Sequence, residues 1–293
     1  MTRSSLAERL TRLHPAASGY RALLVLLGVT IYYAGAAEVY STWGFERAHY
    51  LSVFGLVVPD AILGSPALHL GARILCLVSA VAWALRLATP VSGWVTAISF
   101  TVLASVATES LAYTRHQFNG LNMLLFVFAA WSHLYGRELK AAKLSELSEL
   151  RAFPAWVYWT SVAYLALTYT YSGWTKLYYG GLDWANGTTL QLWVSVNGVG
   201  RAPWLERLIV EQRDLTAGMQ WVALLAEAGC LLALTNLWAR LAIGLVLVGF
   251  HLSVELLFGF NFWGNIAAVG LLFVAQPLCV LWGRRSGDAD WDY

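Results

Sequence analysis

The sequence predicts an all-α fold: a polytopic membrane helical bundle with about eight transmembrane helices. First, 58% of the 293 residues are hydrophobic and only 12% are charged, whereas a soluble domain of this length exposes more charge. Second, apolar stretches long enough to cross ~30 Å of hydrocarbon, about 20 helical residues each, recur along the chain. Third, these stretches are continuous rather than alternating, which favours helices over a membrane β-barrel.

The chain reads as a single membrane domain over residues 1–293, with an interfacial helix in residues 1–19 and a polar cytoplasmic tail in residues 283–293. Within the first segment, Ser4 to His14 has leucines on one side and charges on the other, as in helices that lie on a membrane surface. The expected spans are Tyr20 to Ser41, Leu68 to Ala88, Val91 to Tyr113, Phe118 to Tyr135, Pro154 to Lys176, Thr216 to Trp238, Ala239 to Phe260, and Phe262 to Trp282.

The basic residues predict the orientation. With both termini in the cytoplasm, the inner side collects twelve of the nineteen Lys and Arg residues, in agreement with the positive-inside rule. The two substantial polar loops, Trp43 to Ala67 and Leu177 to Leu215, then face outward. We therefore expect an integral protein of a bacterial inner membrane with its functional face outside. Short inner loops and the absence of GxxxxGK[ST] or GxGxxG disfavour ATP-driven transport.

Composition also bears on partners and metals. A net charge of +2 is nearly balanced, so nucleic acid is not expected as a partner. Cys76, Cys230 and Cys279 lie in apolar runs without CxxC spacing, which predicts small buried hydrophobic residues. The sequence has no HExxH motif and no close His or Cys pair, so no metal is expected.

Ionisable residues inside the spans are the informative ones, because each costs several kcal/mol unless it is paired or faces water. Lys176 is the one lysine of three that lies outside the charged inner loop. Ser172 and Gly173 precede it by one helical turn, so the helix surface beside the amine is nearly bare and a planar ligand fits there. Aromatic walls formed by Tyr169 and Trp174 would desolvate the amine and favour its neutral, proton-accepting form. The alternative is a lysine that snorkels from an aromatic belt.

Other ionisable residues accompany Lys176 on the outer side. If the third helix continues, Glu109 and His116 share one stripe of it; in the seventh span His251 and Glu255 stand at i and i+4, where the carboxylate can fix the histidine tautomer. Either histidine could instead satisfy buried backbone groups. Glu227 lies in the most apolar surroundings and is expected to be either protonated or paired with a cation from another helix.

The run Ser172-Gly173-Trp174-Thr175-Lys176-Leu177, followed by Asp183-Trp184 and Gly187, resembles a helix end of the vitamin K-dependent γ-carboxylase and the wider horizontally transferred transmembrane family. Two further stretches resemble the same family in the same order: His116 to Leu121, and Phe250 to Ser253 running into Phe258-Gly259-Phe260. The match covers most of the chain as topology and three short patches as sequence.

This resemblance implies an integral membrane enzyme that uses a lysine base on a reduced quinone, such as vitamin K hydroquinone, with O2 and CO2 as possible co-substrates. Oxygenation of the hydroquinone would be coupled to modification of a peptide. The resemblance implies Lys176 as the base and His116 as a donor to a developing oxyanion. The expected cofactor-binding residues are His251, Glu255, Tyr169, Ser172, Gly173, Trp174 and Glu109.

The sequence also departs from the carboxylase. Thr175 stands where the carboxylase has a second lysine, and the sequence ends at Tyr293 without the large soluble region that helps bind the peptide. The expected partners are therefore lipids and a lipid-soluble quinone, with a secreted or membrane peptide as a possible substrate. The alternative function is a non-catalytic membrane assembly, immunity or peptide-maturation partner. A transporter is disfavoured because the sequence has no convincing repeat.

Overall fold

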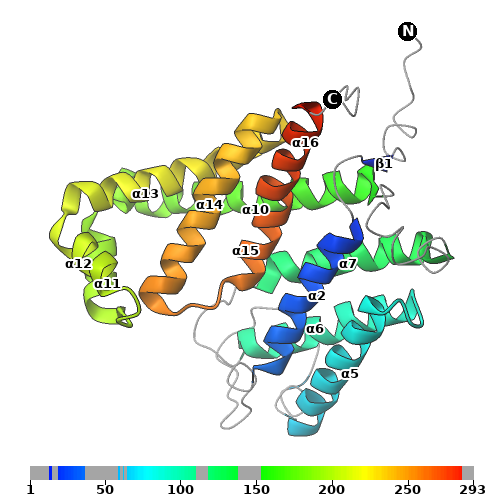
Figure 1. Ribbon diagram of the computed structural model, residues 1–293. Coiled ribbons are helices and arrows are strands. Elements are labelled where there is room, and N and C mark those ends of the chain that lie inside the picture. Colours follow the sequence, from blue (N-terminus) through cyan, green and yellow to red (C-terminus); the bar gives the residue numbers. More distant parts are fainter. Residues whose placement is uncertain are drawn as a thin grey trace. The chain divides into compact units, whose positions relative to one another are not determined.

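The computed structural model describes residues 13–14, 19–36, 59, 62, 65–109, 118–137 and 153–285 (Figure 1). The chain divides into two compact units, Ala17–Val157 in one and Met1–Ala16 with Tyr158–Tyr293 in the other. Apart from turns and connecting loops, the described part of both units is helical except for the two-residue extended segments β1 (Leu13–His14) and β2 (Phe153–Pro154). The predicted all-α class is thus confirmed.

The unit Ala17–Val157 contains four described helices: α2 (Gly19–Gly35), α5 (Pro66–Ala84), α6 (Val91–Glu109) and α7 (Asn119–Leu134). Aromatic side chains form much of its core, where Phe118 meets the rings of Tyr33 and Phe100 edge to face. The indole nitrogen of Trp83 donates to Ser132 Oγ at 2.9 Å, which satisfies two buried polar groups between α5 and α7.

The other unit carries the C-terminal helices. After α10 (Ala155–Gly180) the chain forms η3 (Gly181–Ala185), α11 (Thr188–Asn197), α12 (Pro203–Glu211), α13 (Arg213–Ala228), η4 (Cys230–Leu234) and α14 (Leu237–Phe258). A last helix follows as α15 (Trp263–Val269), the π-helical η5 (Gly270–Ala275) and α16 (Gln276–Arg285). It runs back along α14 (Figure 1).

Local sequence explains where the long helix α14 begins and ends. Asn236 caps its first turn by accepting a hydrogen bond from Ala239 N at 2.8 Å. Gly259 ends it in the left-handed region, with φ +63°, which a glycine adopts without steric cost. In its middle, Gly244 lies so close to η5 that a Cβ there would be 2.6 Å from Phe273 Cβ.

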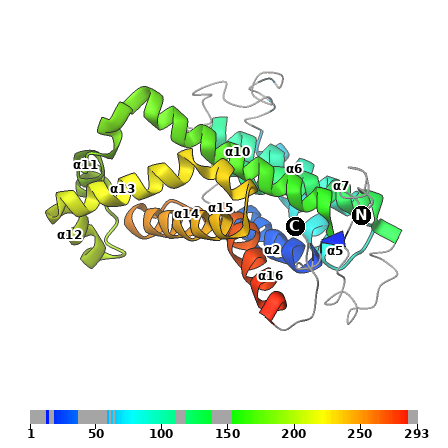
Figure 2. The ribbon, with the colours of Figure 1, turned by 90° about the horizontal axis from the view of Figure 1, so that it is seen from above.

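Helices α11 and α12 form a hairpin at one end of this unit (Figures 1 and 2). Buried side chains fix the hairpin to the C-terminal end of α14: Val194, Ala202, Leu205 and Ile209 pack against Leu257 and Phe258. The segment Leu177 to Leu215, which the sequence predicts as an outer loop, is mostly helical in the structure.

Three of the described helices are long and apolar enough to cross a membrane: Pro66–Ala84, Leu237–Phe258 and Trp263–Leu281. This supports a membrane protein. The eight predicted crossings are not confirmed as a set, although a described helix begins in or beside each predicted range. Gly19–Gly35 and Val91–Val106 are apolar but shorter, and α10 is rich in Tyr, Trp and Thr, which are less apolar than the aliphatic residues of a membrane core.

Most of the expected surface helix Ser4 to His14 lies outside the described residues. Its last two residues, Leu13 and His14, are extended as β1, so the predicted helix does not reach His14. Of the polar tail, residues 286–293 lie outside the described part. The described beginning of the tail, Gly283 to Arg285, forms the end of α16.

Candidate functional site

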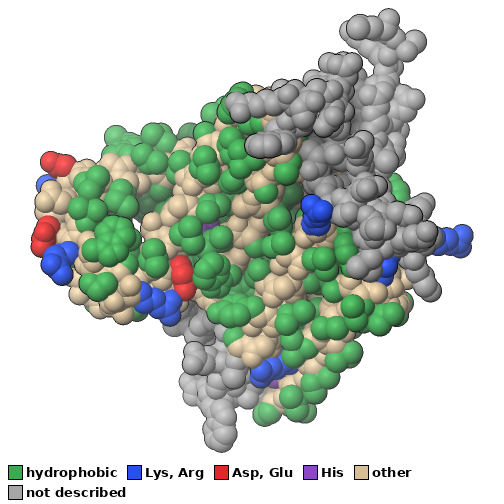
Figure 3. All heavy atoms as spheres, in the orientation of Figure 1, with side chains coloured by type: hydrophobic (Ala, Val, Ile, Leu, Met, Phe, Trp, Pro, Cys, Tyr) green, Lys and Arg blue, Asp and Glu red, His purple; other side chains and the backbone are tan. Residues whose placement is uncertain are grey.

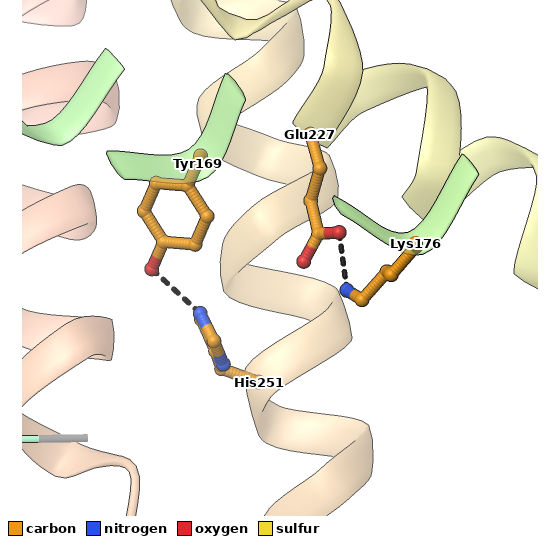
Figure 4. Close-up of polar contacts among 4 residues, drawn as sticks. All are labelled: Tyr169, Lys176, Glu227 and His251. Atoms are coloured by element: carbon orange, nitrogen blue, oxygen red, sulfur yellow. Dashed lines mark hydrogen bonds and ion pairs between the residues drawn. The ribbon is translucent and has the colours of Figure 1, made fainter. Parts of the chain in front are cut away.

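Lys176 forms an ion pair with Glu227 inside the unit that contains α10 to α16 (Figure 4). The lysine lies in the last turns of α10 and the glutamate in the last turn of α13. The Lys176 side chain is 24% exposed and the Glu227 side chain 3%. The amine is therefore the outer member of the pair and the carboxylate the buried one. Of the two states expected for Glu227, pairing with a cation is the one observed.

Gly173 explains why α10 and α13 approach closely enough for this ion pair. A Cβ at position 173 would lie 2.3 Å from the backbone nitrogen of Ala228, closer than real Cβ contacts allow. The bare helix surface that the sequence predicts beside the amine is thus covered by α13 and is not open to a planar ligand. The close approach places Glu227, the residue before Ala228, beside Lys176.

Two aromatic rings flank the amine. Lys176 Nζ lies 4.9 Å from the centre of the Trp184 ring and 5.5 Å from that of Phe250, which are cation–π distances. The predicted walls were Trp174 and Tyr169. Trp174 is exposed, and Tyr169 is buried in contact with His251. Side chains at different positions along a helix point in different directions.

Tyr169 and His251 make a second polar contact in the same unit. Tyr169 Oη lies 2.6 Å from His251 Nε2 (Figure 4), and both side chains are buried. The imidazole stacks on Phe262 at 4.9 Å between ring centres. Tyr169 therefore links α10 to the histidine of α14.

Glu255 has a different partner from the one expected. Its Oε1 accepts from Arg201 Nη1 at 2.7 Å, whereas the i, i+4 spacing predicts a contact with His251. Arg201 comes from the segment between α11 and α12, and its guanidinium lies over Gly259. The guanidinium is always charged, and a charge-assisted hydrogen bond is about twice as strong as one between neutral groups.

The structure describes less of the other predicted site residues. His116 lies outside the described residues, so the structure does not bear on the role expected for it. Glu109 is the last residue of α6 in the unit Ala17–Val157, and its side chain lies outside the described part. Ser172 precedes Gly173 in α10 and is partly buried.

The structure offers no metal site in its described residues: no group of three or more His, Cys, Asp or Glu side chains is placed to hold an ion there. Cys76 and Cys230 are buried, as predicted, while Cys279 is exposed. The prediction of a buried side chain is wrong for Cys279, because an apolar run does not show which of its residues face outward.

Sequence reasoning missed Trp184 and Phe250 as the rings beside Lys176. Trp184 was part of the family resemblance, and its position in η3, eight residues after Lys176, was the available signal. Comparisons of the chain with protein-family models, with curated proteins and with solved structures give no match. The geometry of the site is therefore what carries the functional argument.

Proposed function

We propose that this protein is an integral membrane enzyme in which the Lys176–Glu227 pair takes a proton from a lipid-borne hydroquinone. The proposal follows the resemblance to the membrane core of the vitamin K-dependent γ-carboxylase. One observation carries it: an amine and a carboxylate form a pair in apolar surroundings, and the amine is the more exposed member. A site that receives a proton from outside needs this ordering.

The residues at the site fit a reduced quinone in their chemistry. Trp184 and Phe250 supply apolar ring surfaces beside Lys176 Nζ. The Lys176 side chain is partly exposed, so a ligand can approach it from the surface of the protein. Tyr169 and His251 lie deeper, where they support the site. When bound, the reduced quinone would supply, together with O2, the strong base that modifies a peptide in the family that the chain resembles.

The geometry of the pair suggests how these residues move the proton. Lys176 passes one of its protons to Glu227, becomes a neutral amine, and then accepts the proton of a ring hydroxyl, which restores the ammonium. The pair as a whole gains one proton, and the quinol oxygen is left as an anion beside the ammonium. Because the carboxylate is buried, protonation removes a charge from an apolar environment, where charges are costly. Trp184 and Phe250 cover part of the amine and limit its contact with water, which favours the transfer.

The expected test is a comparison of purified wild-type protein and variants in lipid nanodiscs with a reduced naphthoquinone. Wild-type protein should consume O2 and oxidise the quinone. Lys176→Ala and Glu227→Gln should each lower the rate by roughly 100-fold or more, the usual size of a general-base contribution. Arg207→Ala, which removes an exposed cation of α12, is the matched control and should leave the rate unchanged.

The non-catalytic alternative makes a different prediction. If the ion pair only joins α10 to α13, wild-type protein should neither consume O2 nor oxidise the quinone, while Lys176→Ala should lower the thermal stability. A full rate in folded Lys176→Ala protein would disprove the assignment of the base. The proposal also includes the orientation given by the basic residues, with both termini in the cytoplasm and the site outside.

A further inference from the structure

We propose that the α11–α12 hairpin (residues 188–211) is an interfacial membrane anchor that lies in the headgroup region of one leaflet. The surface it uses is defined here as the lipid-facing patch: Leu192, Trp193, Val196, Val199, Trp204 and Leu208. All six side chains are exposed. This inference is independent of the enzymatic function proposed above.

The hairpin buries one side and leaves an apolar side exposed. Val194, Leu205 and Ile209 turn inward onto α14. On α11, Leu192 and Val196 stand one turn apart, and Val196 is 72% exposed; on α12, Trp204 and Leu208 repeat this spacing, and Trp204 is 67% exposed. Residues three or four apart share a helix face. Each helix is therefore apolar on two faces, of which the protein covers one.

Charged side chains border the patch. Arg207 and Glu211 are exposed on α12, and Arg213 and Asp214 follow at the start of α13. Figure 3 shows these types of side chain together at the end of the unit where α11, α12 and the start of α13 lie. Tryptophans next to charges on a short amphipathic helix are typical of the membrane–water boundary.

The connection to α14 places the hairpin at the right depth. The hairpin packs on Leu257 and Phe258, the last residues of a helix long and apolar enough to cross a membrane. Val199 N donates to Leu257 O at 3.0 Å. Arg201 pairs with Glu255, two residues before Leu257 in α14. The end of a spanning helix lies at the bilayer boundary, so the attached hairpin lies there as well.

The anchor has a consequence for the site on α10. Gln220 in α13 joins the two ends of the segment between η3 and α11, since its Nε2 donates to Trp184 O at 2.9 Å and its Oε1 accepts from Gly187 N at 2.8 Å. Trp184 is the ring beside Lys176 Nζ. The depth of the hairpin therefore fixes the depth of Trp184 and Lys176 relative to the headgroups.

Photolabelling of the wild-type protein tests the anchor. The protein is reconstituted with a phosphatidylcholine that carries a diazirine near the top of its acyl chain, and labelled peptides are mapped after irradiation. Label is expected on Leu192, Val196, Trp204 or Leu208. Peptides of residues 188–211 that remain unlabelled, while peptides from α14 are labelled, would overturn the proposal.

A second measurement identifies what covers the patch if lipid does not. Single-cysteine variants Val196→Cys and Glu211→Cys, with the native cysteines replaced by Ala, carry an environment-sensitive fluorophore in vesicles. Spin-labelled lipid should quench the fluorophore at 196, and a water-soluble quencher the one at 211. Quenching of position 196 by the aqueous agent alone means a surface in water, and quenching by neither means a surface covered by protein. Both results contradict the anchor.

Discussion

At the level of single residues, the site depends on the close contact of α10 and α13 at Gly173. The sequence singles out Gly173 and Lys176, because a small residue and an isolated cation in an apolar run can be recognised by residue type alone. It cannot show that the missing side chain at 173 makes room for a helix and not for a ligand. That distinction depends on Ala228, which is 55 residues away in the chain and comes close only on folding.

Gly173→Ala provides a test of this contact. The added methyl group would overlap the backbone of Ala228, so α10 and α13 must separate, and we expect a loss of stability of roughly 1–3 kcal/mol, typical of overpacking. Thermal unfolding in detergent, monitored by circular dichroism, measures it.

Gly218→Ala is the matched control for this substitution. Gly218 lies within α13, and nothing lies within 4 Å of a Cβ at that position. The same change of residue type should therefore stabilise the protein by about 0.4–1 kcal/mol, because alanine has less conformational freedom in the unfolded chain. Equal effects at 173 and 218 would show that the helices do not meet at Gly173.

At the level of elements, the end of α13 and the start of α14 differ from prediction. The sequence predicts separate spans up to Trp238 and from Ala239, while the structure ends α13 at Ala228 and begins α14 at Leu237. A short helical segment, η4, lies between them. Hydropathy alone misses this break because η4 is itself apolar. Gly229 and the capping residue Asn236 are the local features that mark it.

Arg240 stabilises this junction from inside. Its side chain is only 2% exposed; Nε donates to Ala233 O at 2.8 Å, and Nη1 donates to Tyr158 Oη at 2.5 Å. The guanidinium also lies 4.8 Å from the centre of the Trp159 ring. It thereby joins η4 and α14 to the start of α10.

Arg240→Lys should weaken this junction. A lysine keeps the charge but has one compact ammonium group, so it cannot reproduce the planar fork that bonds both oxygens and stacks on Trp159. Loss of a hydrogen bond from a buried charged group costs about 1.5–3 kcal/mol. The midpoint of thermal unfolding should fall accordingly, whereas Arg207→Lys, at an exposed position of α12, should not change it. An unchanged midpoint for Arg240→Lys would contradict the contacts described here.

At the level of the whole molecule, the apolar composition predicts a membrane protein, and the three long apolar helices agree with it. Many large apolar side chains on these helices are exposed, among them Leu70, Val78 and Leu245. The number of crossings is harder to predict from hydropathy, because helices such as α10 carry both aromatic and polar residues. The composition of such a helix fits a position beside other helices as well as one against lipid.

The three native cysteines offer a test of the membrane assignment without any substitution. Cys76 and Cys230 are buried in protein, and Cys279 is exposed on the surface of a helix assigned to the membrane. A surface thiol in water reacts with a charged maleimide, while a thiol in hydrocarbon does not, since the reactive thiolate does not form there. In leaky vesicles, which admit the reagent to both sides, none of the three should react.

After denaturation in SDS all three cysteines should react, which controls for oxidation or blockage of the thiols. Detergent exchange adds a second control, because a short-chain detergent that leaves the helix surface partly wet should expose Cys279 before Cys76 and Cys230. Mass spectrometry of the labelled peptides distinguishes the positions. Rapid labelling of Cys279 in intact lipid would mean that water reaches this face of α16, and the helix Trp263–Leu281 would then not cross the bilayer in the way its apolar length implies.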